Sequence, residues 1–279
     1  MKVASRPGAS RPNYVAGGFA AIWLVIVGLP IYTLVSWSLQ TRDSFFSRGP
    51  LALPGSLTLD NFFEVLDSGF VRYLLNTVIV TVACVALTLV VAVPAAYSIV
   101  RSMSWASGTM FRVFLAGLAI PAQATIIPLY LIINKLQLYD SLTAIILPTV
   151  AFGLPLVILV LVGSLRDVST ELYDAMTVDG AGPFRILWQL VLPMSRGAIA
   201  AVGTYTALGA WNQFLFPLIL TQDPSMRVLT LSLTSYKQEF QINVPGMMMA
   251  VLLTALPVFV LYLVARRWLI AGLAGVGSK

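Results

Sequence analysis

The chain has 279 residues, of which 58% are hydrophobic and 10% charged, and its formal net charge is +6. A soluble domain typically carries about 25% charged residues, so this chain has too little charge to cover a water-facing surface. His is absent and Cys84 is the only cysteine, which excludes an internal disulfide and His-based metal or acid/base chemistry.

The charged residues are separated by six long uncharged stretches, each longer than the roughly 20 residues that cross a bilayer core. A charge at the centre of a membrane helix costs roughly 2.5–3.5 kcal/mol, so these stretches predict transmembrane spans. In chain order the predicted spans are residues 14–39, 73–100, 113–134, 141–165, 198–220 and 247–265. A buried core helix is the alternative for any one stretch, but six together favour an all-α polytopic membrane protein.

The predicted transmembrane domain covers residues 14–271, between an N-terminal tail at 1–13 and a C-terminal tail at 272–279. The first apolar run exceeds the roughly 7–15 residues of a signal-peptide core, so we expect it to remain as an anchor. Every predicted span contains proline, which membrane helices tolerate and which suits a bundle that bends.

Lys and Arg in the loops predict the orientation, because short cytoplasmic loops are enriched in both. The side that holds both termini, the 101–112 loop and the 166–196 loop carries eleven of them, and the opposite side carries six. Both termini are therefore expected in the cytoplasm, with residues 40–72, 135–140 and 223–239 outside. The cations are too thinly spread for a nucleic-acid-binding face.

The predicted spans lack charged groups at membrane depth, where ion-coupled carriers usually place them. Their polar groups are neutral and can hydrogen-bond a hydroxylated ligand, while aromatic faces can stack on a sugar ring. Helix–helix hydrogen bonding is the alternative role for most of them. The candidate substrate-path residues are Gln123, Thr149, Tyr205, Trp211, Asn212 and Gln213.

No lysine follows a glycine, so the chain lacks a phosphate-binding P-loop. Active transport by this chain would therefore need a partner that hydrolyses the nucleotide.

The longest predicted cytoplasmic segment, residues 166–196, reads as helix, sharp turn, helix. Ser169 or Thr170 is a suitable N-cap, and Asp179-Gly180 is a suitable stop because Gly accepts the left-handed conformation. Pro183 suits the first position of a second helix, which Pro193 ends. The apolar residues of that helix, at helical spacing, are Phe184, Leu187, Trp188 and Val191.

Two interpretations of this unit remain open on periodicity alone. It is either an amphipathic pair that rests in the lipid headgroups, with Arg185 and Gln189 toward water, or a knob that fits a groove on another protein.

The segment resembles the EAA motif of the permease subunits of bacterial ABC importers, in their carbohydrate-uptake branch. The residues that carry the resemblance are Glu171-Leu172, Asp174-Ala175-Met176, Asp179-Gly180-Ala181 and Leu192-Pro193. Asp174 stands where the motif has Glu, and Met176 where it has its second Ala. Stretches farther along are similar to the same branch: Trp211-Asn212-Gln213-Phe214, Pro217-Leu218, Leu229-Thr230-Leu231, Arg267-Trp268 and Gly272-Leu273.

The resemblance implies a MetI/MalG-like permease fold of six transmembrane helices with a cytoplasmic coupling helix. In that family the coupling helix sits in a cleft on an ATPase subunit. The resemblance therefore implies that Glu171, Asp174 and Ala175 contact the ATPase, with Leu172 and Met176 beside them. Gly180 would be a hinge, and Asp179 and Ala181 would shape the turn.

The resemblance also implies the partners. Two ATPase subunits would use ATP and Mg, and a second homologous permease would complete the pore. An external solute-binding protein would deliver a sugar or related polyol near the loop at about Gln222 to Pro245. This chain would bind no cofactor or metal, would not itself be an enzyme, and would lie in the bacterial inner membrane.

Two other classes are weighed against this hypothesis. A self-sufficient channel or secondary carrier for a small neutral solute is the main alternative. An intramembrane hydrolase needs a Ser–His, Ser–Lys or paired-Asp centre, but the chain has no His and the predicted spans have no Lys or Asp.

Overall fold

The computed structural model describes residues 13–49, 55–102, 104–233 and 243–274, and within these ranges the regular structure is helical. The helices that begin the chain are α1 (Tyr14–Ser38), α2 (Arg42–Arg48), α3 (Asp60–Val65), a π-helical turn (Leu66–Phe70) and α4 (Val71–Arg101). An isolated bridge pairs Gln40 with Leu57. Residues 1–12 and 275–279 of the predicted tails, and residues 234–242 of the loop from Gln222 to Pro245, lie outside the described residues.

The middle of the chain forms α5 (Trp105–Gly117), a 3₁₀ turn (Ala122–Thr125), α6 (Ile126–Lys135), α7 (Leu142–Arg166) and α8 (Thr170–Val178). There follow α9 (Pro183–Ile186), a π-helical turn (Leu187–Val191), α10 (Leu192–Met194) and α11 (Arg196–Trp211). The described chain ends with α12 (Leu215–Leu220), a 3₁₀ turn (Pro224–Met226), α13 (Leu229–Ser232) and α14 (Val244–Ala274).

Polar caps determine where several helices begin. Asn13, Thr41, Ser104 and Ser141 each accept a hydrogen bond from a backbone N–H in the first turn of the helix that follows. Each cap satisfies one of the N–H groups that a helix start leaves without an intrahelical partner.

Three described helical runs are long and apolar enough to cross a membrane, namely α1, the run Asp60–Arg101, which is kinked at Gly69, and α7. Counting two bent helix pairs as one span each raises the number to five. The apolar part of α14 that the structure describes in full, Val244–Val260, is shorter than a span. The count of six spans therefore stays a prediction.

The stretch predicted as a span at 113–134 contains a sharp bend in the structure. The chain bends by 92° between Trp105–Gly117 and Ala122–Lys135. Pro121 explains the break, because proline has no N–H and disfavours helical geometry in the residue before it. The predicted span at 198–220 is also interrupted, since α11 ends at Trp211 and a new helix begins at Leu215. Uncharged composition continues across both breaks, so hydropathy alone could not locate them.

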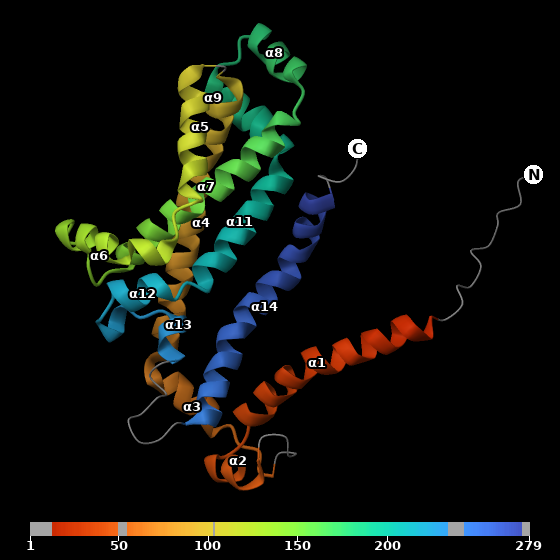
Figure 1. The fold of residues 1–279 in the computed structure, drawn as a ribbon, viewed down its shortest axis with the longest axis vertical. Helices are drawn as coiled ribbons and strands as arrows, with labels where there is room; N and C mark the ends of the chain where they lie inside the picture. The colour runs from red at the N-terminus through yellow and green to blue at the C-terminus, as the bar shows by residue number, and fades with distance from the viewer. Residues whose placement is uncertain (1–12, 50–54, 103, 234–242, 275–279) are drawn as a thin grey trace, which may run out of the picture.

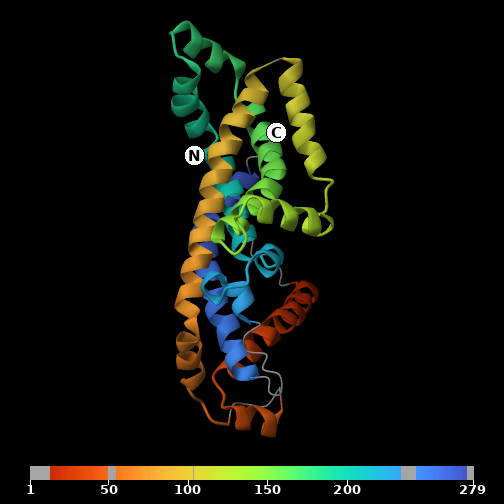
Figure 2. The same ribbon diagram turned by 90° about the vertical axis from the view of Figure 1, so that its left-hand side faces the viewer.

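α4, α7 and α11 form the packed centre of the molecule, and α8 to α10 stand at one end of it, opposite α2 (Figure 1, Figure 2). α1 leans away from this bundle in Figure 1, and its apolar window has no buried residue. The main core cluster joins the C-terminal half of α4 to α7, α8 and the α9–α10 segment.

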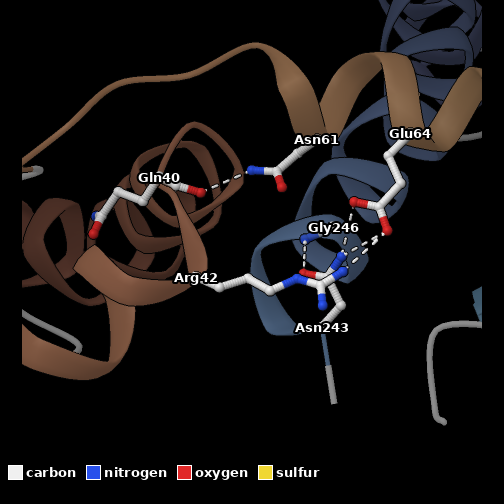
Figure 3. A network of polar contacts seen from close by, with 6 residues as sticks. All are labelled: Gln40, Arg42, Asn61, Glu64, Asn243 and Gly246. Atoms are coloured by element: carbon white, nitrogen blue, oxygen red, sulfur yellow. Dashed lines mark hydrogen bonds and ion pairs between the residues drawn. The ribbon is translucent and has the colours of Figure 1, made fainter. Parts of the chain in front are cut away.

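Polar contacts hold together the end of the molecule that contains α2 (Figure 3). The Asn243 side-chain amide donates to both carboxylate oxygens of Glu64, at 3.1 and 3.0 Å, and Arg42 pairs with the same carboxylate at 3.1 Å. The Asn61 amide donates to the carbonyls of Ser38 and Gln40 at 2.9 and 2.8 Å. These bonds join the first helices to the start of α14.

Candidate functional site

α8 stands out from the end of the bundle and exposes most of its surface (Figure 1). Ser169 caps it by accepting a hydrogen bond from the Glu171 backbone N–H at 3.2 Å, as the sequence predicts. Tyr173 is the buried residue of this helix. The exposed residues include Glu171, Leu172, Asp174 and Ala175, all predicted to be coupling residues. The geometry is that of a knob anchored along one side.

The turn after α8 has the hydrogen bonds of a Schellman motif. Gly180 adopts φ +78°, its N–H donates to the Thr177 carbonyl at 3.0 Å, and the Ala181 N–H donates to the Met176 carbonyl at 2.9 Å. This 6→1 and 5→2 pattern satisfies carbonyls at the helix end and favours Gly at the left-handed position. The predicted stop at Asp179-Gly180 is confirmed. Ala181 is buried in the core cluster against which Met176 packs.

Met176 therefore faces the chain's own core rather than outward. The Met176 side chain, which is larger than the Ala of the motif, packs against the core cluster under α8. Ala175 is exposed, so the outer face of α8 carries a small side chain at this position.

A cation and two aromatic rings anchor α8 to the end of α4. Tyr173 is 1% exposed, and its ring stacks on that of Tyr97 with centroids 6.3 Å apart. The Arg101 guanidinium lies 4.7 Å from the Tyr173 ring centroid and pairs with the Asp174 carboxylate at 3.6 Å. Burial raises the pKa of Tyr173, the neighbouring Tyr97 raises it further, and Arg101 opposes both. Sequence reasoning missed this anchor, because only the fold brings residues 97 and 101 to residue 173.

Only two of the four apolar residues predicted to share one face of the second helix are buried. Leu187 and Val191 are buried, whereas Phe184 is 78% and Trp188 67% exposed. The buried arc instead includes Ile186 and Leu190, which share that side of the helix. Arg185 and Gln189 are exposed and hydrogen-bonded to each other at 3.0 Å, as expected for water-facing residues. α10 ends at Met194, one residue beyond the predicted stop at Pro193.

Two of the predicted path residues, which are neighbours in sequence, line the same hollow. Trp211 and Asn212 line a hollow of about 460 Å³ between α11 and α14. The hollow is mainly apolar, and its other lining residues are Leu208, Leu233, Val251, Thr254, Ala255, Val258, Phe259 and Tyr262. Trp211 is 7% exposed, and its indole N–H has no hydrogen-bond partner among the described residues.

The remaining predicted path residues do not line this hollow. Gln123 and Tyr205 are exposed elsewhere, and the Thr149 hydroxyl donates to the Ile145 carbonyl of its own helix at 2.7 Å. Gln213 lies beside Asn212, but its side-chain oxygen accepts from the Leu215 N–H at 3.2 Å and its carbonyl from the Thr230 hydroxyl at 2.7 Å. For Thr149 and Gln213 these bonds agree with the structural role that the sequence left open.

Comparison with known proteins adds to this geometry. Residues 88–274 match the model of the family described as binding-protein-dependent transport system inner membrane component. The chain belongs to this family. It is 32% identical over 261 residues to a putative ABC transporter permease of Caldicellulosiruptor sp. (strain Rt8B.4), with 94% of this chain and 95% of the relative covered. It is also 32% identical over 282 residues to the diacetylchitobiose uptake system permease NgcG of Streptomyces coelicolor, with 99% and 93% covered.

A solved structure supports the same fold. The chain superposes with a TM-score of 0.78, at 20% identity, on a chain of a bacterial ABC transporter involved in import of the acidic polysaccharide alginate, covering 94% of this chain and 99% of that one. The protein is thus an ABC importer permease subunit and an inner-membrane component. Permeases of this family work with an ATPase and a binding protein.

Proposed function

We propose that this permease forms a pore with a second homologous subunit and imports a sugar or related polyol that an external binding protein delivers. Two separate ATPase subunits, which bind ATP and Mg²⁺, drive the import. α8 carries the proposal, because its exposed outer surface and buried root give it the form of a coupling helix. Its exposed acids and small Ala175 suit insertion into a groove of another protein.

The sidedness of the molecule follows from the same helix. α8 and α2 lie at opposite ends of the molecule (Figure 1). If α8 meets an ATPase in the cytoplasm, α2 and α3 lie on the external side, in agreement with the eleven Lys and Arg assigned to the cytoplasmic side and the six outside. Both termini are then cytoplasmic.

The proposed solute is neutral and hydroxylated. The hollow between α11 and α14 is mainly apolar, and its lining includes no cation. Its polar groups include Asn212 and Thr254, which donate to the Leu208 and Ala250 carbonyls at 2.8 and 2.7 Å and can still accept a hydrogen bond through their side-chain oxygens. An anionic solute would favour Arg or Lys there. The similar permease NgcG is named for diacetylchitobiose, which is a neutral sugar.

Two variants test the coupling role in the assembled complex. Glu171→Lys reverses an exposed charge on α8, and Gly180→Pro removes the N–H that bonds to the Thr177 carbonyl and imposes a negative φ. We expect both variants to reach the membrane but to lose ATP-dependent uptake of radiolabelled diacetylchitobiose or another accepted neutral sugar. Asp43→Lys, an equal charge change on exposed α2, is the control and should retain uptake.

Unchanged uptake in both α8 variants would exclude the coupling role. A second measurement addresses the alternative class. If the purified chain alone moves labelled sugar into liposomes without ATP, it is a channel or secondary carrier, and the proposal fails.

A further inference from the structure

α4 is the element that reaches from the coupling helix to the opposite part of the molecule. It runs without a break from Val71 to Arg101, through Pro94, whereas the α5–α6 and α9–α11 segments bend by 92° and 80°. An unbroken helix can carry a displacement along its length, but a segment with a sharp break absorbs it.

The cytoplasmic end of α4 holds α8 through Arg101 and Tyr97. Arg101 both pairs with Asp174 at 3.6 Å and covers the ring of Tyr173 at 4.7 Å, while Tyr97 stacks on that ring from the preceding turn. Because Tyr173 is 1% exposed, α8 cannot shift away from α4 without uncovering its anchor.

The other end of α4 holds the loop Ser225–Leu229, which we call the outer loop. The buried Asn76 amide donates to the carbonyls of Ser225 and Arg227 at 2.7 and 2.8 Å. In the next position, the Thr77 hydroxyl accepts from the Leu229 N–H at 2.9 Å. Asn76 and Arg101 are 25 residues apart in one helix, or roughly 37 Å along its axis at about 1.5 Å per residue.

We propose that Arg101 and Asn76 are positioning residues at the two ends of α4, through which a movement of α8 on its ATPase displaces the outer loop. The proposal rests on the coupling role of α8 proposed above. It adds that the link to the outer side runs through α4 and ends in the hydrogen bonds of Asn76 and Thr77. Neither residue touches solute or ATPase in this role.

The outer loop can be observed directly, because the single native cysteine, Cys84, is buried. Gln222→Cys, at an exposed position just before the outer loop, provides a site for an environment-sensitive maleimide fluorophore. The assembled complex is placed in nanodiscs and its emission is recorded before and after addition of Mg-ATP with vanadate. ATPase binding is measured on the same samples, so that loss of docking is distinguished from loss of transmission.

Two matched pairs of variants provide the comparison. Arg101→Gln is compared with Arg112→Gln, because Arg112 is exposed and hydrogen-bonds only to Gly108 and Thr109 of its own helix among the described contacts. Asn76→Leu is compared with Asn134→Leu, because the Asn134 amide donates to the Tyr130 carbonyl of its own helix. Thr77→Val serves as a milder change in the same hydrogen-bond set if Asn76→Leu fails to fold.

We expect Arg101→Gln and Asn76→Leu each to reduce the ATP-induced emission change at least about twofold with the ATPase still bound, while both controls respond as the parent does. Arg101→Lys, which retains the charge without the planar guanidinium, should respond between the parent and Arg101→Gln. The double variant Arg101→Gln/Asn76→Leu should lose no more than the larger single loss, because both act on one link. Full responses in the single variants, or a double loss equal to the two single losses combined, would overturn the proposal. A parent complex that binds no ATPase or shows no response to ATP would instead refute the coupling role itself.

Discussion

The turn at Gly180 gives the sharpest test of how α8 is held. A Cβ added there meets no atom within 4 Å, so replacing Gly180 by Ala introduces no clash. The φ of +78° remains, and a left-handed conformation costs a non-glycine residue roughly 1–2 kcal/mol. The whole effect of Gly180→Ala is therefore backbone strain in the Schellman turn.

Hydrogen exchange followed by mass spectrometry measures this strain. The Ala181 amide, bonded to the Met176 carbonyl, exchanges only when the turn opens. Strain of roughly 1–2 kcal/mol raises the open population about 5- to 30-fold, so exchange in the segment 176–182 should accelerate by that factor. Gly180→Asn should lie between the parent and Gly180→Ala, because Asn tolerates the left-handed region better.

Gly182→Ala is the matched control. Gly182 lies two residues away in equally open space but has φ −73°, which any L-residue adopts. We expect unchanged or slightly slower exchange in this variant, because Ala restricts the unfolded chain. Equal acceleration in Gly180→Ala and Gly182→Ala, or none in either, would refute the reasoning.

Three further predictions concern other parts of the molecule. A Cβ on Gly246 would lie 2.5 Å from Nδ2 of Asn243, so Gly246→Ala should break the hydrogen bond from Asn243 to Glu64 and lower the thermal unfolding temperature. Gly209→Ala, where the added Cβ meets no atom within 4 Å, should leave that temperature unchanged. Ala175→Met on the exposed surface of α8 should leave the unfolding temperature unchanged but weaken ATPase binding in a pull-down titration. Hydrogen bonds from Ser225 lower the pKa of Asp223. The ionised Asp223 therefore stabilises the fold above about pH 4, and this stabilisation is lost as the pH falls through the lowered pKa. In an acid titration followed by tryptophan fluorescence, Asp223→Asn should remove the part of the pH dependence that comes from this carboxylate.

Local chemistry in the sequence predicted local structure well. The Ser169 cap, the stop at Gly180 and the start at Pro183 each depend on neighbours within a few residues, and each is confirmed. The EAA resemblance likewise indicated the family, because a motif with fixed spacing needs no knowledge of the fold.

Features that depend on distant residues could not be predicted in this way. The 92° bend near Pro121 lies inside an uncharged stretch, and proline is present in every predicted span, so its presence alone does not mark a break. The pairing of Arg101 with Asp174 and of Asn76 with the outer loop requires knowing which helix ends meet. For the same reason, composition proposed six path residues, but only Trp211 and Asn212 line the hollow.

The contact of Asp174 with Arg101 separates the acids of α8 by role. A surface ion pair of this kind, with the Asp174 side chain 70% exposed, is worth about 0–1 kcal/mol, so it directs the carboxylate toward α4 without locking it. Glu171 has no ion pair among the described residues and lies in the first turn of α8, on the exposed surface. A carboxylate bound internally is less available to a partner than an unpaired one. Glu171 is therefore the acid best placed to meet the ATPase, and its charge reversal should impair docking more than that of Asp174.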